Sequence, residues 1–284
     1  MDDVARMLEA AKLHLRKPIN EVLPPSLLLY LVPPLPSLRL VITLFILSFG
    51  LLIRVWYILP SRKTRASPSS PAKTHKKRQG LTVAVFLGSG GHTTELLQLL
   101  SALPVTRYTR RIYFVSSGDQ FSFDKAKHLE LFLCSSSRTS SGSRSRSEKP
   151  NVKVIEIPRA RKLHQSFITT PLSLLRSALF CIDRVAFRPL ISRQMIADVV
   201  LMNGPGTCVP IVVAVYVLRI LGLASPKLIY VESFARVKSF SLTAKLIRPF
   251  VDRFVLQWPR HPSLVDAATR QNAGSNTVFS GWLV

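Results

Sequence analysis

The sequence predicts an α/β protein with a Rossmann-like parallel sheet and one N-terminal transmembrane helix. Six short apolar runs follow one another between residues 81 and 258, and the stretches between them have the apolar spacing of helices. Two glycine-rich loops, at residues 88–91 and 203–207, each follow one of these runs. A separate apolar segment at residues 40–53 is uncharged and much longer than a typical strand.

The uncharged segment LVITLFILSFGLLI is the centre of a predicted membrane anchor at residues 38–59. With the VWYILP that follows, it provides about 20 residues, enough to cross a hydrocarbon layer of roughly 30 Å. A cleaved signal peptide and a buried core helix are the alternatives. The proline-rich leader without a small-residue cleavage site disfavours the first, and the basic segment that follows disfavours the second.

The charges on the two sides of the anchor predict its orientation. The segment from Arg54 to Gly80 carries eight Lys or Arg residues and no acid, whereas Met1 to Glu21 carries four basic and four acidic residues. Because basic flanks favour the cytosolic side, residues 1–37 are predicted to be a short lumenal segment and the bulk of the chain to be cytosolic. The linker at 60–80 is rich in Pro, Ser and Lys without apolar periodicity, which predicts disorder.

The predicted domain spans residues 81–284. Its strands are expected in LTVAVFL, RIYFVSS, VKVIEI, ADVVLM, KLIYVES and DRFVLQW, and their alternation with helices is typical of a parallel sheet. A Ser/Arg-rich stretch at 134–150 is predicted to be a low-complexity loop. The basic, apolar stretch at 166–196 suits either a helix in the membrane interface or a core-facing helix with a solvated basic face.

Composition narrows the classes of partner. The formal net charge of +24 indicates an anionic partner, and its position near the membrane-proximal segments favours lipid and phosphate over nucleic acid. The three cysteines are odd in number and widely spaced, which disfavours a disulfide framework and a zinc site. The sequence therefore predicts no nucleic-acid partner, no metal and no cofactor.

The first glycine loop, GSGGH, lies between a predicted strand and a predicted helix. Glycines there let backbone N–H groups at the helix start approach a phosphate or diphosphate. The dinucleotide fingerprint would need glycine at position 93, which is Thr93, and no Walker A lysine follows. The alternative is a glycine turn needed only for tight packing. The phosphate-binding candidates of this loop are Gly88, Ser89, Gly90 and Gly91.

His92 favours the functional interpretation of this loop. The positive end of a helix favours the neutral imidazole, which can accept a proton from a hydroxyl. Glu95 lies on the same helix face, where it either orients His92 or, like Thr93, simply caps the first turn.

A second loop, NGPGT, repeats the same arrangement after another predicted strand. Two glycine turns at the carboxyl ends of strands in one parallel sheet face the same crevice, where such folds bind ligands. Glu232 ends a further strand as either a ligand contact or an acid at a helix start. The candidates from the second loop are Asn203, Gly204, Gly206 and Thr207.

The combination of GSGGHTTE, NGPGTCVPI, YVESFARVKSFSLTAKLI and VLQWP closely resembles the asparagine-linked glycosylation protein 14 family. The resemblance covers residues 81–284 and the anchor, and the Ser/Arg stretch departs from the shorter family connection. The resemblance implies that this chain is the acceptor-binding half of a GT-B glycosyltransferase. This enzyme adds the second GlcNAc to GlcNAc-diphosphate-dolichol on the cytosolic face of the endoplasmic reticulum. The implied donor-binding partner belongs to the asparagine-linked glycosylation protein 13 family.

On this resemblance the two glycine loops bind the acceptor diphosphate, and His92 and Glu232 are the catalytic candidates. A similarly built bacterial transferase acting on a lipid-linked peptidoglycan precursor has a His-Glu dipeptide, of which this chain keeps only the acid. The apolar C-terminal segment at 277–284 is predicted to dock the partner. Its docking residues are Phe279, Trp282, Leu283 and Val284.

Two other function classes remain open at this stage. The first alternative to a transferase subunit is a structural membrane recruiter without catalytic residues. The second is a membrane-tethered enzyme that binds a dinucleotide or a methyl donor. The missing third glycine, together with the lack of an acid directly after RIYFVSS, disfavours the enzyme alternative.

Overall fold

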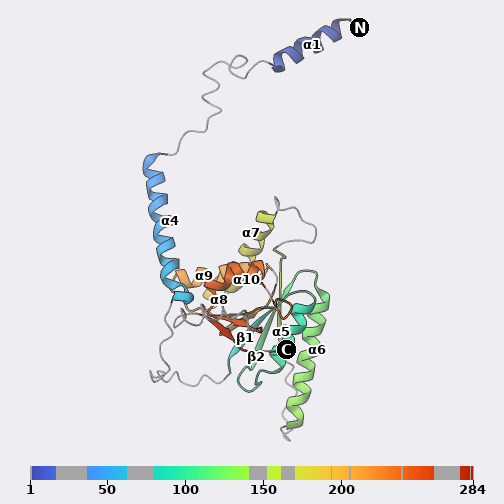
Figure 1. Cartoon of the computed structure of the whole chain (residues 1–284), viewed down its shortest axis with the longest axis vertical. Helices are drawn as coiled ribbons and strands as arrows, with labels where there is room; N and C mark the ends of the chain where they lie inside the picture. Colours follow the sequence, from blue (N-terminus) through green and yellow to red (C-terminus); the bar gives the residue numbers. More distant parts are fainter. Residues whose placement is uncertain are drawn as a thin grey trace. The chain divides into compact units, whose positions relative to one another are not determined.

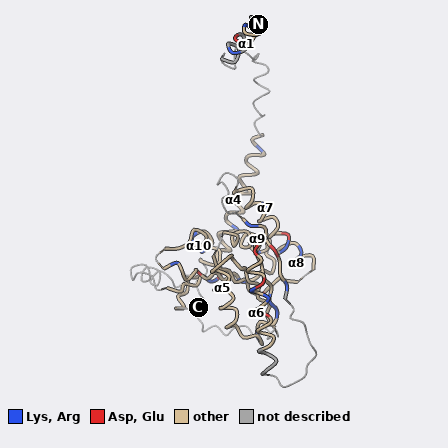
Figure 2. Tube along the Cα trace, turned by 90° about the vertical axis from the view of Figure 1, so that its right-hand side faces the viewer, with Lys and Arg blue, Asp and Glu red and all other residues tan. Residues whose placement is uncertain are grey.

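The computed structural model describes residues 2–16, 37–62, 80–140, 152–160, 170–192, 194–204, 206–237, 239–258, 276–281 and 283. The chain forms two compact units, Met1–Leu52 and Ile53–Val284. The first contains helix α1 (Asp2–Arg16) and most of helix α4 (Leu38–Ile58). Of the described helices, α4 is the one long and apolar enough to cross a membrane. Its charged residues are Arg39 and Arg54, and most of its trace in Figure 2 is uncharged.

The second unit is built on a seven-stranded sheet in which every neighbouring pair of strands is parallel. This confirms the predicted α/β class and all six predicted strands. The strand order is β3-β2-β1-β4-β5-β6-β7. The strands are β1 (Thr82–Leu87), β2 (Arg110–Ser116), β3 (Val152–Ile157), β4 (Val199–Met202), β5 (Lys227–Val231), β6 (Arg253–Leu256) and β7 (Thr277–Phe279).

Strand β7 is the element that the sequence pattern missed. It lies within the tail that was predicted only as a docking segment, and it extends the sheet by pairing with β6. Asn276 stabilises its start, because the Asn276 side-chain amide donates to the carbonyl oxygens of Arg248 and Val251 at 2.7 and 2.6 Å. The tail therefore contributes backbone to the domain as well as exposed side chains.

Helices cover both faces of the sheet (Figure 1). Helices α5 and α6 pack on one face, where α5 contacts β1 and α6 contacts β2. The other face carries α7 and α9 with the helical segments η2 and α8, and α10 lies beside α9. The bounds are α5 (Gly91–Ser101), α6 (Gln120–Ser140), α7 (Thr170–Cys181), the π-helix η2 (Ile182–Phe187), α8 (Arg188–Ile191), α9 (Cys208–Ile220) and α10 (Leu242–Ile247), with short 3₁₀ turns η1 (Pro60–Arg62) and η3 (Arg248–Phe250).

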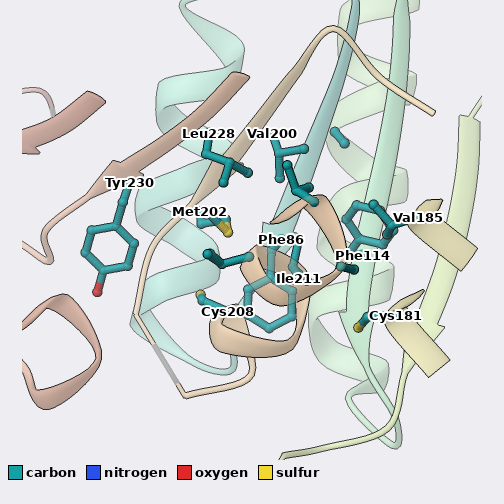
Figure 3. Close-up of a cluster of buried hydrophobic side chains, with 14 of the residues drawn as sticks. Phe86, Phe114, Cys181, Val185, Val200, Met202, Cys208, Ile211, Leu228 and Tyr230 are labelled. Atoms are coloured by element: carbon teal, nitrogen blue, oxygen red, sulfur yellow. The ribbon is translucent and has the colours of Figure 1, made fainter. Parts of the chain in front are cut away.

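Alternating side chains of each strand supply two hydrophobic cores, because successive residues of a strand point to opposite faces. On β1, Ala84 and Phe86 pack toward α9, whereas Val83 and Val85 pack toward α5. Figure 3 shows the first of these cores around Phe86. Burial raises the pKa of the Cys181 thiol to about 12, so it is protonated at neutral pH. The residues labelled in Figure 3 are Phe86, Phe114, Cys181, Val185, Val200, Met202, Cys208, Ile211, Leu228 and Tyr230.

The described part of the basic stretch at 166–196 packs on the sheet. The π-helix η2 buries Val185 and Ala186, and α7 buries Ser177 and Cys181. Helix α7 also exposes the side chains of Leu172, Leu175 and Leu179. One face of α7 is therefore buried in the domain while an apolar face is exposed, and the choice between an interfacial helix and a core-facing helix stays a prediction.

Helix α6 extends through Ser140 and includes the first part of the stretch that was predicted to be a Ser/Arg loop. Ser135 remains compatible with the helix, since its hydroxyl donates to the carbonyl oxygen of Phe132 at 2.7 Å. Residues 141–150 of that stretch, and the linker at 63–79, lie outside the described residues.

Candidate functional site

The candidate site lies where the chain changes direction across the sheet. Strand β1 leads to β2 on one side, and after β3 the chain crosses to β4 on the other side of β1. In open parallel sheets, ligands bind outside the carboxyl ends of the strands at this switch point. The two predicted glycine loops follow β1 and β4, so the sheet brings them together as expected.

The first loop exposes its backbone at the start of α5. Gly88 is buried, whereas Ser89, Gly90 and Gly91 are exposed. Gly90 has φ +68°, a conformation that suits glycine, and no side chain caps the first turn. Within the part of the chain that the structure describes, no side chain caps the first N–H groups of α5, as a phosphate-binding helix start requires.

Thr93 ties this loop to the domain instead of capping the helix. Its hydroxyl hydrogen-bonds to the carbonyl oxygen of Gly88 and lies 2.6 Å from the Ser122 hydroxyl. Ser122 in turn donates to the Asp119 carboxylate at 2.7 Å. The glycine loop therefore has a fixed, buried support beneath its exposed backbone.

The second loop packs directly against His92. Gly204 has φ +94°, and a Cβ atom added there would lie 2.6 Å from Cγ of the His92 ring. Glycine is needed at this position both for the backbone conformation and for the close approach of the ring. Thr207 is buried, while Gly206 is exposed.

Asn203, whose side chain is 0% exposed, joins the two loops. Its Oδ1 atom lies 3.0 Å from Nδ1 of His92, and its Nδ2 atom donates to Oε2 of Glu95. Glu95 was expected either to orient His92 or to cap the helix. In the structure the Glu95 carboxylate is linked to His92 through Asn203.

Residues after β5 complete the network. Oε1 of Glu95 accepts hydrogen bonds from the Ser233 hydroxyl at 3.1 Å and from the Phe234 N–H at 3.2 Å. Ser233 and Phe234 were not among the residues predicted for the site. Their one sequence signal is their place directly after Glu232, at the end of a predicted strand.

Glu232 is 2% exposed and begins the segment that reaches Glu95. Its carbonyl oxygen accepts from the Gln257 amide at 3.0 Å, which holds the end of β5 to the end of β6. Nearby, burial raises the pKa of Tyr230, so its hydroxyl stays protonated and donates to the Gly204 carbonyl oxygen at 3.4 Å. Glu232 thus lies at the same edge of the sheet as His92.

The described docking candidates lie on or beyond β7, the outermost strand of the sheet. Phe279 is 53% exposed on β7, and Leu283 is 36% exposed beyond it. Trp282 and Val284 lie outside the described residues. The described tail therefore presents apolar side chains on the last strand of the sheet.

The fold and these loops define an α/β protein with a candidate ligand site at the switch point of its parallel sheet. The chain belongs to the family described as "Oligosaccharide biosynthesis protein Alg14 like", whose model matches residues 83–273. That match includes both glycine loops and the network around Glu95.

Two curated relatives agree with this family. The chain is 39% identical over 215 residues to the "UDP-N-acetylglucosamine transferase subunit ALG14" of Cryptococcus neoformans strain JEC21, covering 75% of this chain and 86% of that protein. It is 42% identical to the subunit of the same name from Schizosaccharomyces pombe, covering 68% and 81%. Acinetobacter baumannii MurG is 13% identical with a TM-score of 0.41, covering 70% of this chain and 45% of that one.

Proposed function

We propose that this chain is the acceptor-binding subunit of an N-acetylglucosaminyltransferase. The enzyme would add the second GlcNAc to GlcNAc-diphosphate-dolichol, and this domain would form one half of its GT-B architecture. The observation that carries the proposal is the convergence of two glycine loops around His92 at the switch point, in a family whose members are named as UDP-N-acetylglucosamine transferase subunits.

The loops have the chemistry to hold the acceptor. The backbone N–H groups of Gly90 and Gly91 bind the diphosphate at the start of α5, and Gly88, Ser89, Gly206 and Thr207 shape the same surface. Thr93 and Ser122 keep the first loop in place beneath the ligand. The acceptor sugar then lies toward His92, which the second loop supports through Gly204.

His92 acts as the general base. It takes the proton from the acceptor sugar hydroxyl while that oxygen attacks C1 of UDP-GlcNAc. The C1–O bond to the diphosphate breaks, its electron pair leaves with UDP, and the new glycosidic bond forms. Glu232 is the second catalytic candidate, because it lies at the same edge of the sheet and directly precedes Ser233 in the network.

A donor-binding partner of the asparagine-linked glycosylation protein 13 family supplies UDP-GlcNAc. The partner docks on the tail, where Phe279 exposes an aromatic ring on β7. Exposed apolar side chains on an edge strand are a typical docking surface. Trp282, Leu283 and Val284 follow in the sequence as further apolar residues of this tail.

Helix α4 anchors the complex as a single transmembrane pass in the endoplasmic reticulum, with the sheet domain in the cytosol. Its length and apolar composition support a crossing, and the basic segment after it supports this orientation. The lipid acceptor is thereby held at the membrane in which it is dissolved.

A transfer assay tests the proposal. The full-length chain, purified alone or with a donor-half partner, is incubated with UDP-GlcNAc and a GlcNAc-diphosphate-lipid. We expect transfer by the complex and none by the chain alone. Transfer by the isolated chain at the rate of the complex would contradict the proposed division between two subunits.

The docking surface is tested by Phe279→Asp, which places a charge on the exposed face of β7 without removing the strand. We expect loss of the partner in co-purification. Leu131→Asp is the matched control, because Leu131 is 61% exposed on α6. Equal recovery of the partner by both variants would show that the tail is not the docking surface.

A further inference from the structure

The position of the proton on His92 follows from the chain of side chains that begins at Glu95. Ser233 and Phe234 donate to one oxygen of the Glu95 carboxylate, and Asn203 donates to the other. The remaining Asn203 atom, Oδ1, lies 3.0 Å from Nδ1 of His92. Helix α5, which follows β1, and the segments after β4 and β5 therefore meet at this one carboxylate.

Each hydrogen bond between Glu95 and His92 permits only one assignment of donor and acceptor. An ionised carboxylate only accepts hydrogen bonds, so the Asn203 group that faces Glu95 must be the amide NH₂. The Asn203 carbonyl oxygen must then face His92, and this oxygen also only accepts. Nδ1 of His92 therefore carries the proton, and in the neutral imidazole Nε2 is left with a free lone pair.

We propose that Glu95 is a positioning residue that acts through Asn203 to select the His92 tautomer with an unprotonated Nε2. The inference rests on the proposed function, in which His92 is the base that deprotonates the acceptor hydroxyl. When Nε2 takes that proton, the imidazolium keeps its Nδ1–H bond to Asn203. The Glu95 charge at the far end of the chain stabilises this cation.

Replacing Glu95 with Gln reverses the donor and acceptor roles in this series of hydrogen bonds. The Gln oxygen retains the bonds from Ser233 and Phe234, which leaves its NH₂ group facing Asn203. Since two NH₂ groups cannot pair, the Asn203 amide turns over and presents NH₂ to His92. Nδ1 must then accept, the proton moves to Nε2, and His92 cannot take a proton from the acceptor.

A second substitution restores the original donor and acceptor roles at His92. In Glu95→Gln with Asn203→Asp, the carboxylate at position 203 accepts from the Gln NH₂ group and from Nδ1 of His92. The double variant therefore returns the proton to Nδ1. Glu156→Gln is the matched control, because it makes the same chemical change at an exposed position on β3.

The test uses the full-length chain assembled with its partner in lipid nanodiscs and labelled with ¹⁵N-histidine. Solid-state NMR reports which ring nitrogen carries the proton, and His92→Ala identifies the His92 signals. We expect an Nδ1–H signal in the wild type, an Nε2–H signal in Glu95→Gln, and Nδ1–H again in the double variant. Because a wrong tautomer can cost up to ~10⁴-fold, kcat is expected to fall by at least ~10²-fold in Glu95→Gln and to recover at least tenfold in the double variant.

The outcomes separate this inference from the proposed function. An unchanged His92 tautomer in Glu95→Gln would overturn the inference. A tautomer that switches while kcat stays constant would support the inference and overturn the role of His92 as base. If Glu95→Gln alone does not assemble, the double variant must still assemble with the Nδ1–H form, and its failure to do so would also overturn the inference.

Discussion

Replacement of His92 by alanine is expected to lower kcat of the assembled complex by about 10²- to 10⁴-fold, the typical contribution of a general base. The acceptor KM is expected to change little, because in the proposed mechanism the backbone of the first loop, and not the imidazole, binds the diphosphate. The substitution also removes the hydrogen bond between His92 Nδ1 and Asn203 Oδ1 and the ring that lies against Gly204, so thermal unfolding of the variant is compared with that of the wild type first.

Steady-state kinetics with varied acceptor measure this effect once membrane association and partner binding are shown to be unchanged. His128→Ala is the matched control, because His128 is exposed on α6. A His92→Ala complex with kcat within a few-fold of the wild type would assign His92 a structural role, as in the recruiter alternative. The base would then have to come from elsewhere in the complex.

Replacement of Glu130 by glutamine is expected to destabilise the sheet domain by about 3–5 kcal/mol. Glu130 is 3% exposed on α6 and binds the guanidinium of Arg111 on β2 with both oxygens, at 2.5 and 3.0 Å. The Tyr113 hydroxyl also donates to it at 2.5 Å. Burial raises the pKa of Tyr113, so this hydroxyl stays protonated, and the substitution leaves the buried cation of Arg111 without its counter-charge.

Thermal unfolding of the purified chain measures the effect. For a domain of this size, 1 kcal/mol shifts Tm by about 2–4 °C, so a decrease of about 6–20 °C is expected. Glu156→Gln, at an exposed carboxylate of β3, should leave Tm within about 1 °C of the wild type. Equal Tm values for the two variants would show that the Arg111–Glu130 pair contributes nothing to stability.

Local pattern was sufficient to predict most of the sheet. Each of the six apolar runs became a strand, because strands buried on both faces read as continuous apolar segments. Strand β7 lacked this signal, since Thr277–Phe279 is short and its place beside β6 depends on tertiary pairing. The same limit applied to Cys134–Ser140, where a Ser-rich composition predicted a loop but α6 continues.

The site was predicted in part for a similar reason. Glycine loops at strand ends identify a ligand-binding edge from sequence alone, and His92 lies there as expected. The link from Glu95 to Asn203 and Ser233 depends on β1 and β5 both being neighbours of β4. Local periodicity does not reveal strand order, so the sequence left open whether Glu95 orients His92 or caps the helix and could not reveal its contacts with Asn203 and Ser233.

We propose that this chain binds the acceptor and that its partner binds the donor. Isothermal titration calorimetry of the isolated full-length chain in detergent, with a short-chain GlcNAc-diphosphate-lipid or with UDP-GlcNAc, tests this division. We expect saturable binding of the acceptor analogue and no binding of UDP-GlcNAc at the same concentrations. Saturable binding of UDP-GlcNAc with none of the acceptor analogue would contradict it.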